Sequence, residues 1–256
     1  MKRHLLLFLL TVSISIVSQT IRTYNINGLT RKAIFYEPIL KSDKIPVVFV
    51  FHGHGGNANF VSKRIDIQNY YKEALVIFME GFPGRTVPGL DPNGKMNGWQ
   101  IFADDLEGRD IQFFDKVLSD IHQKNYNIDD KKIYLIGHSN GARFVNVLWK
   151  TRGDKIAAIC SASAQGGNMI SGAVPISVWM YIGKNDRMVF PKSQEESIPI
   201  VKSNLGITDK GKTDGNKTIF SGKNNTELVL QQSNSGHEFP KSSLPEIISF
   251  FKRHTK

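Results

Sequence analysis

The sequence predicts an α/β domain whose central sheet is mostly parallel. Apolar runs of strand length recur along the chain, helical or turn segments separate them, and several of the runs are continuously apolar. Such runs are typical of strands that are covered on both faces. The 256 residues, 40% of them apolar, suit one globular domain with a sizeable core. We expect it to span residues 21–256, with helices on both faces of the sheet.

The first two expected strands, 21–26 and 32–37, flank the dipeptide Asn27-Gly28. An Asn-Gly pair between strands indicates a tight hairpin, so we expect the sheet to open with antiparallel strands. The remaining strands are expected at residues 46–51, 75–79, 132–136, 156–161, 176–182 and 227–230.

Three segments have helical patterns. Residues 110–122 place apolar side chains on one helical face, namely Ile111, Phe114, Leu118 and Ile121. The segment after Ser139 also suits a helix. Near the end, Ser243 and Glu246 have the spacing of a capping box, which predicts a closing helix.

Two long connections interrupt the pattern of strands and helices. Residues 80–109 are rich in Gly and Pro, and they exceed the ~12–15 residues at which structureless loops become uncommon. They are therefore a candidate substrate-binding loop. Residues 205–225 are polar and rich in Gly and Lys, which favours a solvated excursion.

Residues 1–20 have the build of a secretory signal peptide, with cleavage expected near Ser18–Thr20. The apolar run 5–17 is shorter than the ~20 residues that a membrane helix needs, so an uncleaved anchor is the less favoured alternative. We expect a secreted or periplasmic protein without stable membrane insertion. Cys160 is the only cysteine, which excludes an intrachain disulfide, and its apolar setting indicates a core residue rather than a nucleophile.

The chain is basic, with 33 Lys and Arg against 23 Asp and Glu and a formal net charge of +10. Nucleic acid, anionic glycans or a membrane surface could be attracted by such a balance. The lysines are scattered, however, and no nucleic-acid motif accompanies them. We expect a solvated basic surface and no nucleic-acid partner.

The strongest functional signal is the run Gly137-His138-Ser139-Asn140-Gly141. It fits G-x-S-x-G between an expected strand and an expected helix, a context that places a nucleophilic serine on a sharp turn. The turn leaves little room for side chains, hence the two glycines. His138 is expected to shape the turn without doing chemistry.

A serine nucleophile needs a base and an orienting carboxylate, which in this chain order follow later strands. Asp186 follows the strand expected at 176–182, and His237 follows the strand expected at 227–230. The ordinary alternatives are a turn aspartate and a surface histidine. Asp209 and Asp214 are weaker candidates for the acid because no strand directly precedes them.

An oxyanion formed by attack on an ester needs backbone donors. One is expected from the N–H of Asn140, immediately after the serine. The second is expected from His54 in the glycine-rich loop 52–57, with Gly55 as a neighbouring candidate. That loop fits neither common phosphate-binding pattern.

These motifs together resemble a known family. HGHGGN after a strand, Gly98-Trp99, the helix at 110–122, IYLIGHSNGA, the GKND loop and the GHEFP ending are similar to α/β-hydrolase esterases related to polyhydroxybutyrate depolymerases and feruloyl or acetylxylan esterases. The resemblance implies the α/β-hydrolase fold and an extracellular carboxylic-ester hydrolase with Ser139, Asp186 and His237 as the triad. The chain departs from the family in lacking cysteine pairs and in Glu238 directly after the histidine.

The resemblance implies as substrate a small or polysaccharide-linked ester: a plant-wall phenolic or acetyl ester, or a short hydroxyalkanoate ester. This chemistry requires no metal and no organic cofactor. Trp99 is a candidate for stacking on the substrate, and a buried anchor for the long loop is the alternative. A polyester depolymerase, a serine peptidase of the same superfamily and a non-catalytic glycan-binding member remain alternatives, and the oligomeric state stays open.

Overall fold

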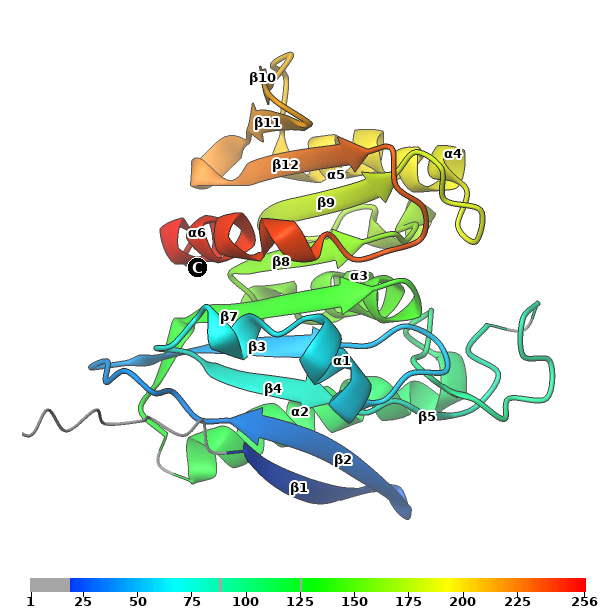
Figure 1. The fold of residues 1–256 in the computed structure, drawn as a ribbon, viewed down its shortest axis with the longest axis vertical. Coiled ribbons are helices and arrows are strands. Elements are labelled where there is room, and N and C mark those ends of the chain that lie inside the picture. Colours follow the sequence, from blue (N-terminus) through cyan, green and yellow to red (C-terminus); the bar gives the residue numbers. More distant parts are fainter. Residues whose placement is uncertain (1–18, 88, 125) are drawn as a thin grey trace, which may run out of the picture.

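The computed structural model describes residues 19–87, 89–124 and 126–256. Nearly all of the expected signal peptide lies outside the described residues. The described chain forms a 10-stranded sheet in the order β1-β2-β4-β3-β7-β8-β9-β12-β11-β10 (Figure 1). Within the described residues, no helix is both long enough and apolar enough to cross a membrane.

Six neighbouring strands form the parallel centre of this sheet, and their arrowheads point to the same side in Figure 1. They are β4 (Leu75–Met79), β3 (Ile45–Phe51), β7 (Ile128–His138), β8 (Ala158–Ala162), β9 (Ser177–Gly183) and β12 (Glu227–Ser233). β4, β8 and β9 are buried along their whole length, as expected for strands covered on both faces. The predicted parallel centre is thus confirmed.

The sheet opens with the expected antiparallel hairpin of β1 (Gln19–Ile26) and β2 (Leu29–Tyr36). Asn27 and Gly28 connect the two strands with φ angles of 51° and 81°. Both central residues of a type I′ turn need positive φ, which is why this dipeptide forms it readily. β2 also pairs antiparallel with β4 and so joins the hairpin to the parallel strands.

The opposite edge of the sheet differs from the expectation of a solvated excursion at 205–225. There, β10 (Lys212–Asp214) and β11 (Lys217–Ser221) form a hairpin that extends the sheet antiparallel to β12. All three residues of β10 are exposed. An edge strand without a buried face has no apolar alternation, so the sequence pattern could not predict it.

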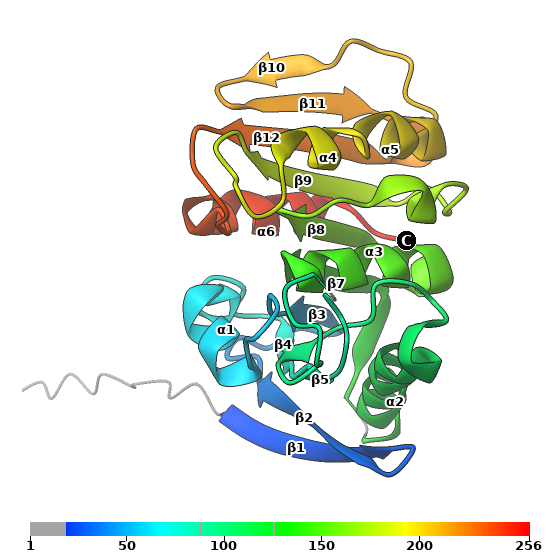
Figure 2. The same ribbon diagram turned by 90° about the vertical axis from the view of Figure 1, so that its right-hand side faces the viewer.

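Helices cover both faces of the sheet, as predicted. α2 (Arg109–Gln123), α3 (Asn140–Arg152) and α5 (Ile198–Leu205) pack on one face, and α1 (Ala58–Arg64) and α6 (Leu244–Arg253) pack on the other (Figure 2). The short α4 (Pro191–Glu195) follows β9. The four apolar residues predicted to share one face of α2 are all buried.

The closing helix α6 lies where predicted, but the capping box expected at its start does not form. The side chain of Ser243 makes no capping hydrogen bond to the helix. Its hydroxyl instead accepts a hydrogen bond of 2.8 Å from the Gln231 amide on β12. This buried contact ties the start of α6 to the sheet, and the backbone of Ser243, with φ −88° and ψ 0°, lacks the extended conformation typical of a capping residue.

The order of the parallel strands reverses at β3, because the chain continues from β3 to β4 on one side and later to β7 on the other. Ligands of such sheets bind beyond the carboxyl ends of the strands at this reversal. The long connection 80–109 returns to this end through the short pair β5 (Phe82–Pro83) and β6 (Asn97–Gly98). The loop after β3 and the turn after β7 therefore meet there.

Candidate active site

The turn between β7 and α3 holds Ser139 in a strained conformation, with φ 56° and ψ −123°. Positive φ is uncommon outside glycine and persists only where the surrounding structure imposes it. A Cβ on Gly137 would lie 2.5 Å from the carbonyl oxygen of Gly141, and a Cβ on Gly141 would lie 2.4 Å from that of Phe51. Both glycines are thus required by close backbone approach, for the reason that the sequence suggested.

Asp186 and His237 meet after β9 and β12. Nδ1 of His237 lies 2.8 Å from Oδ2 of Asp186. A carboxylate can only accept hydrogen bonds, so this ring nitrogen carries the proton. The other ring nitrogen of the neutral imidazole is therefore left as an acceptor, the form that a general base needs.

The carboxylate of Asp186 is held by several donors. Its Oδ1 accepts from the amides of Met188 (2.8 Å) and Val189 (2.9 Å), and Oδ2 also accepts from the Gln194 side chain at 3.0 Å. Burial favours a raised pKa for Asp186, but the hydrogen bonds from His237 and the two amides outweigh it and lower the pKa. Asp186 is therefore ionised and fixed in orientation at neutral pH.

The two competing aspartates lie elsewhere. Asp209 accepts hydrogen bonds from the amides of Gly211 and Ser221 in the edge hairpin. Asp214 is the last residue of the exposed strand β10. Of the three candidate acids, the structure brings Asp186 to the histidine.

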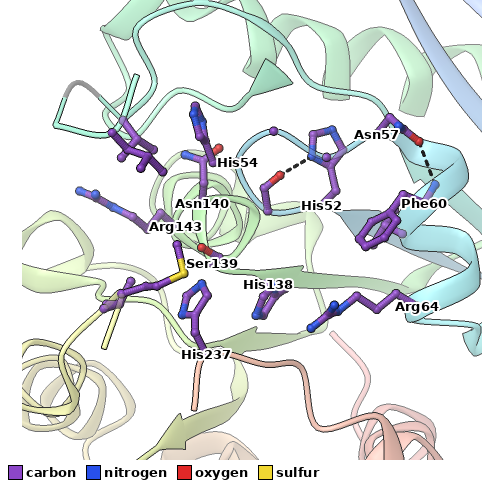
Figure 3. A pocket seen from close by; sticks show the side chains of 18 of the residues that line it. His52, His54, Asn57, Phe60, Arg64, His138, Ser139, Asn140, Arg143 and His237 are labelled. Atoms are coloured by element: carbon purple, nitrogen blue, oxygen red, sulfur yellow. Dashed lines mark hydrogen bonds between the residues drawn. The ribbon is translucent and has the colours of Figure 1, made fainter. Parts of the chain in front are cut away.

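Ser139 and His237 line one cavity of about 810 Å³ at the carboxyl ends of the strands. In Figure 3 the His237 ring points toward Ser139. The two side chains make no hydrogen bond to each other in the described part of the chain. Catalytic hydrogen bonds in enzymes without substrate are often long and shorten in the complex, so this geometry is compatible with a serine and its base.

The loop after β3 lies directly against the serine. A Cβ on Gly53 would come 3.4 Å from that of Ser139 and 3.5 Å from Nδ1 of His138, so the loop packs in van der Waals contact with the turn of the nucleophile. His54 follows and borders the cavity. The amide of Gly55, the neighbouring candidate donor, is engaged with the carbonyl oxygen of Asn97 at 2.7 Å. This favours His54 as the second donor.

Asn140 begins α3, so its backbone N–H belongs to the first turn, which has no carbonyl partner within the helix. Its side chain has a separate task. Oδ1 accepts from the backbone amide of Trp99 at 2.7 Å, and Nδ2 donates to the carbonyl oxygen of Trp99 at 3.0 Å. This reciprocal pair fastens the long connection to the helix of the nucleophile.

Trp99 therefore differs from the expected substrate contact. Its side chain is fully buried, and the indole N–H donates to the carbonyl oxygen of His52 at 2.9 Å. The ring stacks on Phe144 of α3 with 5.3 Å between centroids. The long connection does border the cavity, but through Val87, Gly89 and Leu90. Trp99 is the anchor of that loop, the alternative reading of the sequence.

Two further histidines stand beside the site in neutral form. Burial lowers the pKa of His52 to about 4, and its ring bridges the loop by contacting the Gly53 carbonyl (2.7 Å) and the Gly81 amide (2.8 Å). Burial and then the neighbouring His237 lower the pKa of His138 to about 3. The rings of His138 and His237 lie 4.9 Å apart, so a neutral His138 adds no positive charge beside the base.

The sequence reasoning did not single out several residues of the cavity wall. Arg64 and Phe60 come from α1, Arg143 from α3, and Met188 from the loop after Asp186. A signal was present for Arg143, since it lies four positions after Ser139 and helical spacing places it one turn further along. In the described residues, no cluster of three or more potential metal ligands is found.

No family model and no curated protein matches the sequence. Solved structures do match. An acetyl xylan esterase from Aspergillus awamori is similar with a TM-score of 0.72 and 14% identity, over 91% of this chain and 99% of that chain. A ferulic acid esterase from Anaeromyces mucronatus, solved with ferulic acid, gives 0.62 and 18%, over 94% and 92%.

A carboxylesterase from Bacillus cereus gives a TM-score of 0.56 at 22% identity, over 87% of this chain and 94% of that chain. Similarity at this level of identity concerns the fold. The expected relation to polyhydroxybutyrate depolymerases stays a prediction. The parallel sheet, its antiparallel first hairpin and these similarities together show that the chain has the α/β-hydrolase fold.

Proposed function

We propose that the protein is a serine carboxylic-ester hydrolase. The observation that carries the proposal is the convergence of a strained serine and an Asp186–His237 pair on one cavity. Three distant parts of the chain have to be positioned to build it. The esterases of the same fold support the same class of reaction.

In the proposed mechanism, the Ser139 hydroxyl attacks the ester carbonyl while His237 takes its proton. The oxyanion accepts hydrogen bonds from the backbone N–H groups of Asn140 and His54. His237 then protonates the leaving alcohol, and an acyl group remains on Ser139. Water, deprotonated by His237, then attacks this acyl-enzyme, the bond to the Ser139 oxygen breaks, and His237 returns the proton to that oxygen as the acid leaves. Asp186 stabilises the imidazolium that forms in both halves.

Within this class we propose feruloyl or acetyl esters of plant polysaccharide, or related small esters, as substrates. The named activities of two similar structures favour this choice. A panel of methyl ferulate, acetylated xylan, hydroxybutyrate oligomers and aliphatic esters tests it. Fastest turnover of hydroxybutyrate oligomers would instead indicate a polyester depolymerase, and equal turnover of all four would indicate a general esterase.

The reaction class is tested by the hydrolysis of an activated acetate ester by the wild type and Ser139→Ala. We expect the variant to lose nearly all activity. Unchanged hydrolysis would contradict the mechanism, faster cleavage of peptides than of esters would indicate a peptidase, and glycan affinity without turnover would indicate a binding protein.

We further propose that the protein is exported and that residues 1–20 are removed. The short basic start and the apolar run support this. Amino-terminal sequencing of the protein recovered from the periplasm or medium should begin near Gln19–Ile21. Recovery of the intact chain from the cytoplasm alone would contradict it.

A further inference from the structure

Two guanidinium groups border the cavity that holds Ser139. Arg64 is the last residue of α1, and Arg143 lies in the first turn of α3, where its amide donates to the carbonyl oxygen of Ser139 at 3.0 Å. In Figure 3 their side chains lie on opposite sides of Ser139 and His237. Positive charge therefore flanks the reacting serine on two sides.

No acidic side chain balances this charge at the cavity. Among the described residues, the cavity lining contains no Asp and no Glu. No carboxylate oxygen in the described ranges lies within the 4.0 Å ion-pair distance of Arg64 or Arg143. Elsewhere in the protein, such pairs are common and involve Arg22, Arg31, Arg109, Arg152 and Arg253.

Arg143 is the stronger of the two candidates for binding an anion. It is half-buried, and its Nε is buried without a hydrogen-bond partner among the described residues. The charge of Asp105 attracts the Arg143 guanidinium, but the two groups lie too far apart to form an ion pair. A half-buried cation without a partner is costly, and a carboxylate matches the planar guanidinium with two parallel hydrogen bonds. Arg64 is exposed and lies beside the ring of Phe60.

The rest of the mouth is apolar. Phe60, Leu90 and Met188 line it with 54%, 56% and 64% of their surface exposed. Exposed apolar side chains around a cavity indicate a ligand that covers them. The cavity thus combines an apolar wall with a cationic anchor near the nucleophile.

We propose that the ester hydrolysed in this cavity carries a carboxylate, and that Arg143 binds that carboxylate. This inference rests on the proposed function and specifies its substrate. The carboxylate belongs either to the acyl group or to the leaving alcohol. Arg143 lies one helical turn from Ser139, so in both cases a carboxylate bound to it would hold the ester carbonyl near the Ser139 hydroxyl.

Two matched pairs of esters separate these cases. Mono-4-nitrophenyl adipate and 4-nitrophenyl hexanoate differ by a carboxylate in place of the terminal methyl of the acyl group. The acetates of 4-(carboxymethyl)phenol and 4-ethylphenol differ in the same way on the leaving group. We expect kcat/KM to be about tenfold or more higher for the anionic member of one pair, as one charged hydrogen-bonded contact can supply.

Arg143→Gln should remove most of that preference through a higher KM for the anionic ester, and Arg143→Lys should restore part of it. Lys63→Gln is the matched control, because it removes one positive charge from α1 outside the cavity lining. The control should keep the preference. If Arg143→Gln fails to fold, the wild-type ratios still test whether the site prefers an anionic ester, and Arg143→Lys tests whether Arg143 binds it.

Equal or better turnover of both neutral esters by the wild type would overturn the inference and leave the proposed function intact. So would a preference that survives in Arg143→Gln, or one that Lys63→Gln or Arg64→Gln abolishes instead. If none of the four esters is hydrolysed, the proposed function fails, and this inference fails with it.

Discussion

Nδ1 of His237 donates to Oδ2 of Asp186 across 2.8 Å, although the two residues lie 51 positions apart in sequence. The carboxylate is almost fully buried, at 2% exposure, and receives three further hydrogen bonds from its own loop and from Gln194. It is therefore oriented before any substrate binds. Preorganised charge of this kind stabilises an imidazolium without rearrangement during the reaction.

Asp186→Asn should lower kcat for an activated acetate ester by about 10⁴-fold, because an amide favours the wrong tautomer of His237 and does not stabilise the imidazolium. Steady-state kinetics measure the loss. Asp209→Asn is the matched control, since that residue serves only the edge hairpin, and its kcat should be close to that of the wild type. Equal kcat values for the two variants would contradict the role of Asp186.

Gly141→Ala should destabilise the protein by about 3 kcal/mol, because the added Cβ would lie 2.4 Å from the carbonyl oxygen of Phe51. Urea unfolding measures the change. Gly89→Ala is the control, since a Cβ there meets no atom within 4 Å, and its effect should stay within ~0.5 kcal/mol. A neutral Gly141→Ala would show that the turn can relax.

Trp99→Phe should lower the free energy of unfolding by about 1–3 kcal/mol, because it removes a buried hydrogen bond to His52 and leaves a cavity beside Phe144. The ratio of kcat/KM for methyl ferulate over an aliphatic ester should stay the same, since the indole does not reach the cavity. A selective loss of ferulate turnover would restore Trp99 as a substrate contact.

The end of α6 carries a prediction on pH. Burial favours a raised pKa for Glu227, but hydrogen bonds from His254 and Arg253 outweigh it and lower the pKa to about 2. The two oxygens of Glu227 each lie 2.9 Å from a nitrogen of Arg253. A carboxyl group whose pKa is lower in the folded than in the unfolded chain stabilises the fold. This contribution is complete above the pKa of the unfolded chain and disappears as the pH falls to the pKa of the folded protein.

Glu227→Gln should therefore unfold more easily than the wild type at pH 6, by on the order of 1–3 kcal/mol. The difference should shrink between about pH 4.5 and pH 2. Thermal unfolding across this range measures it. A difference that is constant with pH would show that the ion pair with Arg253 contributes nothing.

Much of the fold was predictable because local patterns agree with the final packing. Asn27-Gly28 specifies its own turn, and continuously apolar strands such as β4 have few alternatives to a doubly covered sheet. Asp186 and His237 were predictable for a related reason, since parallel strands bring their carboxyl ends to one edge of the sheet. Their position after two strands, in the chain order of this fold, was sufficient to select them.

What the sequence could not predict depends on distant partners. The hydroxyl of Ser243 is taken by Gln231 from another element, so local spacing misled the capping prediction. Trp99 is buried because two residues of α3 hold it in place: the Asn140 side chain bonds its backbone amide, and the Phe144 ring stacks on its indole. The charge at the cavity, from Arg64 and Arg143, is set by two helices that lie apart in sequence. Tertiary contacts decide such cases.

The central claim is that Ser139 becomes the acylated nucleophile. Its most direct test is intact-protein and peptide mass spectrometry after reaction with a fluorophosphonate. We predict a single adduct on Ser139 in the wild type, none in Ser139→Ala, and strongly slowed labelling in His237→Gln. An adduct on another residue, or equal labelling of Ser139→Ala, would contradict the account.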